Sequence, residues 1–300
     1  MNILIIGSKG FIGMHTLRYF TEQSHSVYGC DVVVDYTSEN YILLDATNAD
    51  FQEVFKSRQF DVCINCSGAA SVPDSLIHPH RDFELNVNNV FKMLDAIRKH
   101  QPNCKFINLS SAAVYGNPSS LPVAENAPLR PVSPYGIHKQ MAETILLEFH
   151  IHYNIPTLSL RLFSVYGPCL QKQLFWDLYK KMKTNSDEII VLGTGNESRD
   201  FIYIQDLTRA IDITLQKATF DGKAYNCSNG VEILVRDAVE QFASALKWKG
   251  KITYTHHTRT GDPKNWQAEI SWLKGMQYHP AIDMMEGLKN YVQWLKDENK

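Results

Sequence analysis

Residues 2–13, NILIIGSKGFIG, join an apolar run to a glycine-rich turn and to the start of a helical pattern. The run predicts a β-strand, and helical periodicity begins at Phe11. Gly7, Gly10 and Gly13 have the spacing GxxGxxG, which 16 glycines in 300 residues would produce by chance only about 0.05 times. Such a turn lets a pyrophosphate approach the free N–H groups at the positive end of the helix. The stretch therefore predicts the first strand–turn–helix unit of a dinucleotide-binding fold.

Short apolar runs alternate with helical patterns through the first half of the chain. Strands are predicted at 2–6, 26–34, 41–44, 61–66, 104–109 and 157–163, and helices at 12–23, 48–58, 82–100 and 135–153. This alternation is typical of parallel βαβ units wound with one handedness. We therefore expect an α/β protein with a Rossmann-type doubly wound parallel sheet.

The pattern loosens after about residue 167. Strands are predicted at 189–192 and 200–204, and helices near 172–184, 205–218, 234–247 and 283–296. Together they indicate a small mixed C-terminal lobe. We expect residues 1–163 to form the dinucleotide-binding domain, with 201–226 returning to it. Residues 164–200 and 227–300 would then form the substrate lobe.

Composition excludes several other classes of protein. The chain is 44% hydrophobic and 21% charged, with a formal net charge of -2, so nothing favours a nucleic-acid or anionic-membrane partner. The N-terminal sequence lacks a basic segment before its apolar run, and no run reaches the ~20 residues that span a bilayer. Six scattered cysteines indicate a reducing compartment, so we expect a cytoplasmic protein without signal peptide or membrane span. The Cys63 and Cys66 pair lies along an apolar run, which favours a buried strand over a redox site.

An acidic residue ends the second predicted strand. Asp31 follows Gly13 by 18 residues, where a carboxylate can accept both ribose hydroxyls and repel a 2′-phosphate. Taken alone, Asp31 could equally be a turn residue. In this setting it favours NAD over NADP.

Tyr135 and Lys139 share one face at the start of the fourth predicted helix, with Ser133 as its N-cap. Tyr179 and Lys183 repeat the spacing, and about one such pair is expected by chance, so spacing alone is weak evidence. The first pair is distinguished by two serines, residues 110–111, which end the fifth strand at the sheet edge where ligands bind. A lysine ammonium would lower the phenol pKa, and a serine hydroxyl would polarise a substrate oxygen. The second pair is expected to be a solvated helix face.

These motifs, taken together, resemble the extended short-chain dehydrogenase/reductases, the NAD-dependent epimerase/dehydratase family that acts on nucleotide sugars. The likeness continues through RLFSVYGP at 161–168, GTG at 193–195, RDFI at 199–202 and RTGD at 259–262. The resemblance implies NAD at the carboxyl edge of the sheet and a nucleotide-diphosphate sugar in the cleft between the lobes. It implies Ser111, Tyr135 and Lys139 as catalytic residues.

The resemblance also implies two sets of binding residues. Those for NAD are Gly7, Gly10, Phe11, Ile12, Gly13, Asp31, Asp45 near adenine, Gly68, Ala69, Asn86 on the nicotinamide side, Tyr135, Lys139 and Phe163. Those for the substrate are Ser164, Arg199, Arg259 and Asp262. Guanidinium is the preferred bidentate partner of phosphate, which favours both arginines, although surface salt bridges would explain them too.

Two departures from the family pattern narrow the activity. Dehydratases of the family carry Asp-Glu after the catalytic serine or threonine, where this chain has Ala112 and Ala113, so 4,6-dehydration is not expected. Ser164 stands where many members have asparagine. We expect an NAD-dependent epimerase, in which Tyr135 takes a hydroxyl proton while hydride leaves the sugar and later returns to its other face.

Two alternative functions remain. An NAD(P)H-dependent reductase of a nucleotide-linked 4-keto-6-deoxy sugar would use the same three residues. A catalytically silent dinucleotide sensor would show a broken Ser/Tyr/Lys set, whereas here the set is intact. The paired histidines lack zinc-site spacing, so no metal is expected.

A homodimer is also expected. The predicted helices 82–100 and 135–153 carry apolar residues on more than one face. These are Val87, Val90, Leu94, Ile145, Leu146 and Phe149. Helices of this kind form a dimeric four-helix bundle in the family.

Overall fold

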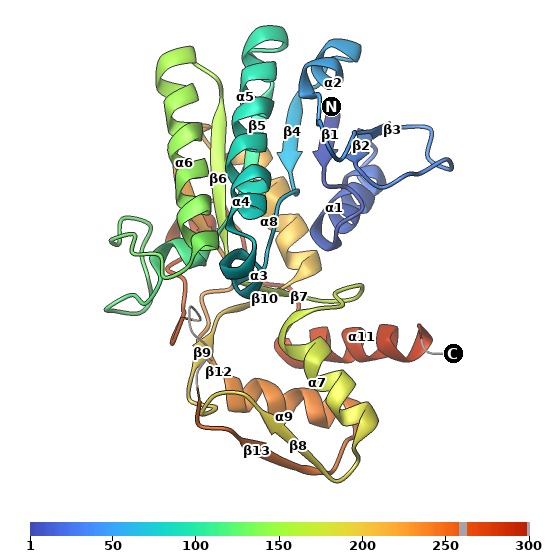
Figure 1. Cartoon of the computed structure of the whole chain (residues 1–300), viewed down its shortest axis with the longest axis vertical. Coiled ribbons are helices and arrows are strands. Elements are labelled where there is room, and N and C mark those ends of the chain that lie inside the picture. The colour runs from blue at the N-terminus through green and yellow to red at the C-terminus, as the bar shows by residue number, and fades with distance from the viewer. Residues whose placement is uncertain (258–262, 299–300) are drawn as a thin grey trace.

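The computed structural model describes residues 1–257 and 263–298 and is built on a seven-stranded sheet (Figure 1). The strands are β1 (Asn2–Ile6), β2 (Ser26–Asp31), β3 (Tyr41–Leu43), β4 (Val62–Asn65), β5 (Lys105–Ser111), β6 (Thr157–Leu162) and β11 (Ala224–Cys227). All their pairings are parallel, in the order β11-β6-β5-β4-β1-β2-β3. The order reverses between β1 and β4, so ligands are expected outside the carboxyl ends of these strands. The doubly wound sheet predicted from the sequence is confirmed.

Alternation along β1 shows how the sheet is covered on both faces. Ile3 and Ile5 pack in one cluster of buried residues, while Leu4 and Ile6 pack in the other. Helices α1 (Phe11–Glu22) and α8 (Ile204–Lys217) contribute to the first cluster. Helices α2 (Phe51–Ser57), α5 (Asn89–His100) and α6 (Pro134–Tyr153) contribute to the second. Because both faces are covered, the strands are continuously apolar.

Two of the differences from the predicted elements bear on the ligand-binding edge of the sheet. The strand predicted over 26–34 ends at Asp31, because its carboxylate accepts the N–H of Val32 at 2.7 Å and the chain turns outward there. The helix predicted over 82–100 is interrupted. It comprises α4 (Pro79–Phe83), a π-helical turn (Glu84–Asn88) and α5. Such turns are frequent at functional sites, and this one carries Asn86.

The second lobe combines helices with short strand pairs (Figure 1). Its helices are α7 (Gln173–Thr184), α9 (Val235–Leu246) and α11 (Met284–Asp297), whereas α10 (Ser271–Gly275) packs against β11 of the sheet. Its strand pairs are β8 (Glu188–Val191) with β13 (Lys251–Tyr254), and β9 (Ser198–Arg199) with β12 (Ile233–Leu234). A further pair, β7 (Ser164–Tyr166) with β10 (Phe201–Tyr203), lies where the chain passes between lobe and sheet. The domain boundaries stay a prediction, although β11 does return to the sheet.

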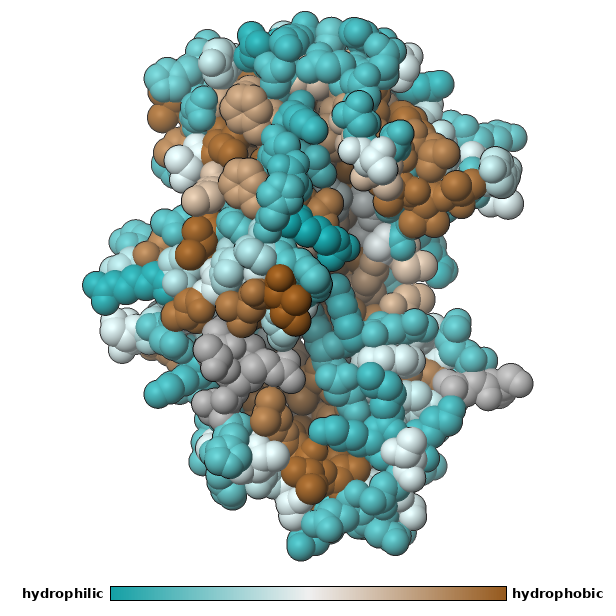
Figure 2. Space-filling view, viewed as in Figure 1, coloured by the Kyte–Doolittle hydropathy of each residue, from teal (hydrophilic) through white to brown (hydrophobic). Residues whose placement is uncertain are grey.

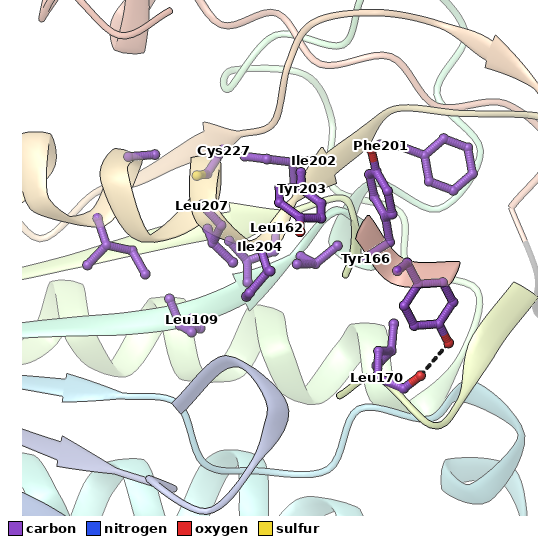
Figure 3. Close-up of a cluster of buried hydrophobic side chains, with 14 of the residues drawn as sticks. Leu109, Leu162, Tyr166, Leu170, Phe201, Ile202, Tyr203, Ile204, Leu207 and Cys227 are labelled. Atoms are coloured by element: carbon purple, nitrogen blue, oxygen red, sulfur yellow. Dashed lines mark hydrogen bonds between the residues drawn. The ribbon is translucent and has the colours of Figure 1, made fainter. Parts of the chain in front are cut away.

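One core joins the lobe to the sheet. Leu109 and Leu162 at the sheet belong to the same buried cluster as Tyr166 and Phe201 (Figure 3). The Tyr291 hydroxyl on α11 donates to the Leu170 carbonyl at 2.6 Å within this cluster. Continuous apolar packing of this kind fixes the relative position of the two parts.

Candidate active site

The glycine-rich turn after β1 can form only because its glycines have no side chains. Gly7 has φ +80°, and a Cβ on Gly13 would lie 2.0 Å from the Gly7 carbonyl oxygen. Gly10 is the N-cap of α1 and has no side chain to cap the helix, so no capping group competes with an anion for the first N–H groups. Phe11 and Ile12 line the cleft beside this turn.

Asp31 lies beside the glycine-rich turn, where its carboxylate accepts the backbone N–H of Lys9 at 2.8 Å. The Lys9 ammonium is bound by Asp35 rather than by Asp31. Asp45, expected near adenine, is exposed two residues beyond β3 and accepts the N–H of Thr47 at 2.7 Å. Asp31 thus ends β2 beside the glycine-rich turn, while Asp45 mainly holds its own turn.

The turn after β4 forms the next part of the cradle. Gly68 has φ +113°, and a Cβ there would lie 2.5 Å from Asn86 Oδ1 and 3.6 Å from Lys139 Nζ. Asn86 Nδ2 donates to the Ala69 carbonyl at 3.2 Å, whereas Oδ1 is buried without a hydrogen-bond partner among the described residues. A buried orphaned acceptor next to a glycine gap is suited to a ligand that donates a hydrogen bond.

The two candidate serines at the end of β5 are turned to different partners. Ser110 Oγ donates to Glu143 Oε1 at 2.6 Å, deep in the protein. Ser111 Oγ accepts the N–H of Ala113 at 3.2 Å, and its side chain is the group that acts to lower the pKa of Tyr135. Ser111, rather than Ser110, is therefore the serine that acts together with the Tyr135 phenol.

Tyr135 and Lys139 begin α6, whose N-cap Ser133 accepts the N–H of Gly136 at 3.2 Å. Lys139 is buried, with Nζ donating to the Leu109 carbonyl at 3.0 Å and lying 5.8 Å from the Tyr135 ring centroid. Both side chains line the cleft with Ser111. The three predicted catalytic side chains are therefore brought together.

Burial is the largest influence on the pKa values of Lys139 and Tyr135. It lowers the pKa of Lys139 to about 8. Burial also raises the pKa of Tyr135 to about 12, while the hydrogen bond with Ser111 acts in the opposite direction. The expected lowering of the phenol pKa is not met in this structure, because desolvation of the phenolate is the largest effect on Tyr135 and raises its pKa.

A buried ion pair supports the site from behind. Glu143, one turn after Lys139, receives two hydrogen bonds from Arg161, at 2.9 and 2.8 Å. Arg161 also donates to the Tyr115 hydroxyl at 2.7 Å. This network ties α6 to the ends of β5 and β6. Sequence reasoning missed it, although Glu143 follows Tyr135 and Lys139 at intervals of four residues.

The cleft runs from the glycine-rich turn to the second lobe and has a volume of about 1130 Å³. Phe163, Ser164 and Arg199 line it together with Gly68 and Ala69. This volume exceeds that of most small-molecule sites, so there is room for a dinucleotide and a second ligand end to end.

Neighbouring groups of the second lobe hold the Arg199 side chain at the cleft. Its guanidinium donates to the Lys264 carbonyl at 3.1 Å and lies 5.5 Å from the Trp266 ring centroid. Asp200 beside it is fully buried and accepts from Ser228 Oγ at 2.7 Å and from the Ala268 N–H at 2.9 Å. Burial raises the pKa of the Asp200 carboxyl to about 6, and the carboxyl ties three segments of the lobe together.

The other predicted substrate-binding residues are Ser164, Arg259 and Asp262. Ser164 is half-buried at the start of β7, and its N–H donates to the Asp200 carbonyl at 2.9 Å. Arg259 and Asp262 lie outside the described residues. Trp266 and Asn117 line the cleft, but no sequence motif indicated them.

Residues 3–228 match the model of the NAD dependent epimerase/dehydratase family. The chain belongs to this family. The resemblance seen in the sequence is thereby confirmed, and the protein is an NAD-dependent enzyme.

Relatives of the family agree over nearly the whole chain. UDP-glucuronate 4-epimerase 4 of Arabidopsis thaliana is 25% identical over 98% of this chain and 75% of its own length. The crystal structure of UDP-glucose 4-epimerase from Thermotoga maritima with UDP-glucose has a TM-score of 0.90 at 25% identity, covering 100% of both chains. UDP-glucuronic acid 4-epimerase from Bacillus cereus, in complex with UDP-glucuronic acid and NAD, has a TM-score of 0.89 at 25% identity, covering 99% of this chain and 100% of that one.

The cradle of this family member fits NAD. The open N-terminus of α1 suits a pyrophosphate, and the gap at Gly68 next to the orphaned Asn86 oxygen suits a polar group of the cofactor. Lys139 has an ammonium with three donors, of which Leu109 uses one. Within residues 1–257 and 263–298, no helix has the length and apolar character needed to cross a bilayer.

Proposed function

We propose that this protein is a UDP-sugar 4-epimerase that uses Ser111, Tyr135 and Lys139. The observation that carries the proposal is the meeting of these three side chains in a cleft that continues to Arg199 in the second lobe. Relatives named as UDP-sugar 4-epimerases, which match 98–100% of this chain, support the choice of substrate class.

In this proposal the roles follow from position. Ser111 Oγ hydrogen-bonds the sugar hydroxyl, and Tyr135, in its phenolate form, accepts the proton of that hydroxyl as the carbon is oxidised. Bound NAD supplies the hydride acceptor and later the hydride donor. Once the keto sugar has turned over, Tyr135 returns the proton. Lys139 would bind the cofactor, and its positive charge would stabilise the Tyr135 phenolate.

The far end of the cleft would hold the nucleotide diphosphate. Arg199, oriented by the Lys264 carbonyl and the Trp266 ring, offers a guanidinium to the phosphates. We propose Ser164, Arg259 and Asp262 as further substrate contacts, with residues 1–163 and 201–226 as the NAD-binding domain. Ala112 and Ala113 lie directly after Ser111, where dehydration would need an acid and a base.

A screen of UDP-, GDP-, CDP- and dTDP-sugars tests the proposal. Epimerisation converts a UDP-sugar to its C4 epimer, seen by NMR of the anomeric proton, with no net change in NADH absorbance. Net consumption of NADH or NADPH with a 4-keto sugar would instead assign the reductase. Tyr135→Phe serves as the control that keeps the cleft but removes the phenolic oxygen.

We also propose a homodimer through α5 and α6, although not through the residues first expected. Val87, Val90, Leu94, Leu146 and Phe149 are buried in the chain's own core, and Ile145 is half-buried and packed against it. The structure exposes a different apolar set on these helices: Phe91 at 43%, Ile137 at 41%, Met141 at 44% and Ile151 at 59%. Figure 2 shows the face of the molecule on which α5 and α6 lie, with apolar side chains among polar ones.

Light scattering on two matched variants tests this interface. The protein is expected at about twice its 34.3 kDa chain mass, and Met141→Glu should give a monomer. Met14→Glu, at a residue of equal chemistry and 41% exposure on α1, should leave the dimer intact. A wild-type monomer at micromolar concentration would overturn the proposal.

A further inference from the structure

A buried aspartate lies behind the reacting side chains and takes no part in the steps above. The Asp82 side chain on α4 is 2% exposed, and its Oδ1 lies 2.6 Å from His138 Nδ1. Its Oδ2 is also buried and has no hydrogen-bond partner among the described residues. Burying a carboxylate at such a position costs desolvation free energy, so a nearby donor or positive charge is needed to stabilise it.

The partner of Asp82 belongs to the helix that carries the site. His138 lies between Tyr135 and Lys139 in the first turns of α6. A second contact fastens the same region, because Ser75 Oγ on α3 (Val72–Ile77) accepts the N–H of Tyr135 at 3.2 Å. The segment containing α3 and α4 is therefore attached directly to the turn that presents the phenol and the ammonium.

Asp82 acts on both groups through space. Its charge raises the pKa of Lys139 against the larger effect of burial, and its influence exceeds that of Glu143. It raises the pKa of Tyr135 as well. Glu143 is paired through both oxygens with Arg161, so much of its charge is already neutralised.

The remaining charged groups around Asp82 are solvated or paired. On α3 and α4, Asp74 is bound by Arg81 at 3.0 Å, and these side chains are 37% and 65% exposed. His80 is 90% exposed, and Glu84 at 41% exposure accepts from Asn88. On α6, His138 contacts Asp82 directly, and Tyr135 and Lys139 in the same turns are the groups whose pKa values its charge raises.

We propose that Asp82, held in place by His138, is the buried counter-charge that keeps Lys139 protonated at neutral pH. Asp82 is thus a positioning residue that acts through the ammonium. Protonated Lys139 lies next to Gly68 and keeps donors for the hydroxyl groups of NAD, which a neutral amine would serve less well. Loss of the Asp82 charge would let Lys139 lose its proton at a lower pH.

The pH dependence of NAD binding tests this role. Affinity of the nucleotide-stripped protein for NAD is measured by calorimetry from pH 6.5 to 9.5, in wild type and in Asp82→Asn. Wild-type affinity should fall as pH rises through about 8, the pKa of Lys139. In Asp82→Asn the midpoint of this fall should move down by roughly 0.5–1 pH unit. A midpoint within 0.3 unit of wild type, or an equal loss of affinity at every pH, would overturn the proposal.

Three further variants separate charge from structure. Asp74→Asn removes the same charge from an exposed residue one helix away and should leave the midpoint unchanged. Asp82→Ser gives a second neutral side chain, so the test stands if Asp82→Asn fails to fold. In a Lys139→Met background, Asp82→Asn should not change NAD affinity further, and an additional loss there would overturn the proposal. NAD alone is the ligand, so the outcome does not depend on the proposed sugar.

Discussion

Two helices of this protein carry the same Tyr-xxx-Lys spacing in opposite surroundings. On α6 the Lys139 ammonium lies 5.8 Å from the Tyr135 ring centroid, and on α7 the corresponding distance from Lys183 to Tyr179 is 5.9 Å. Lys139 is buried, whereas Lys183 is exposed. The α6 pair lies beside Ser111, while Tyr179 packs near Trp176. The local geometry is the same, so chemistry depends on what the fold packs around each pair.

Removing each phenolic oxygen should give the largest contrast. Tyr135→Phe keeps the ring and should fold and bind NAD, yet turnover should fall roughly 10²–10⁴-fold because a positioned acid/base is lost. Tyr179→Phe should stay within about twofold of wild type. Steady-state turnover on the best substrate, with circular dichroism to confirm folding, makes the comparison. Equal losses in both variants would mean that the site is misplaced.

The ion pairs of the two helices should differ nearly as much in stability. Glu143→Ala would leave the buried Arg161 charge without its partner, at a cost of about 3–5 kcal/mol in the free energy of unfolding. The corresponding exposed pair on α7 joins Asp177 and Lys180 at 3.2 Å. Asp177→Ala should change the free energy of unfolding by less than about 0.5 kcal/mol. Urea denaturation measures both, and a small effect of Glu143→Ala would contradict the buried network.

The buried lysine should make stability depend on pH. Burial lowers the pKa of Lys139 to about 8, below its unfolded value of about 10.5. Below pH 8 the folded state bears the cost of a buried charge. Between these two values the unfolded chain binds the additional proton, so stability rises with pH, by on the order of 2–3 kcal/mol.

Lysine-to-methionine variants isolate that contribution. Relative to wild type, Lys139→Met should be more stable at pH 7.5 than at pH 10, whereas Lys183→Met should show no such trend. Thermal or urea unfolding at the two pH values, without added cofactor, gives the differences. A pH-independent difference for Lys139→Met would show that its charge is not buried as described.

The helix N-termini should give the smallest contrast. Ser133 accepts a capping hydrogen bond at 3.2 Å on α6, while Lys172 at the start of α7 makes no side-chain capping bond. Ser133→Ala should cost about 1 kcal/mol, and Lys172→Ala should stay within about 0.5 kcal/mol. Urea midpoints resolve this difference. Equal costs would argue that capping does not fix the first turn that presents Tyr135.

The sequence by itself determined the parts of this protein that local rules govern. Apolar strands alternating with helices predicted the doubly wound sheet, and glycine spacing predicted the turn after β1, because only glycine tolerates that backbone approach. Ser111, Tyr135 and Lys139 were found because a strand end and a helix start each carry a local signal.

Only the tertiary structure decided which groups surround those residues. It buried Val90 and Leu146 in the chain's own core and exposed Phe91 and Met141 instead. It brought Asp82 to His138 across 56 residues of chain, and burial gave Tyr135 a raised pKa. Periodicity marks an apolar face but not what covers it. Desolvation and long-range pairing depend on neighbours distant in sequence, and these are set only when the whole core packs.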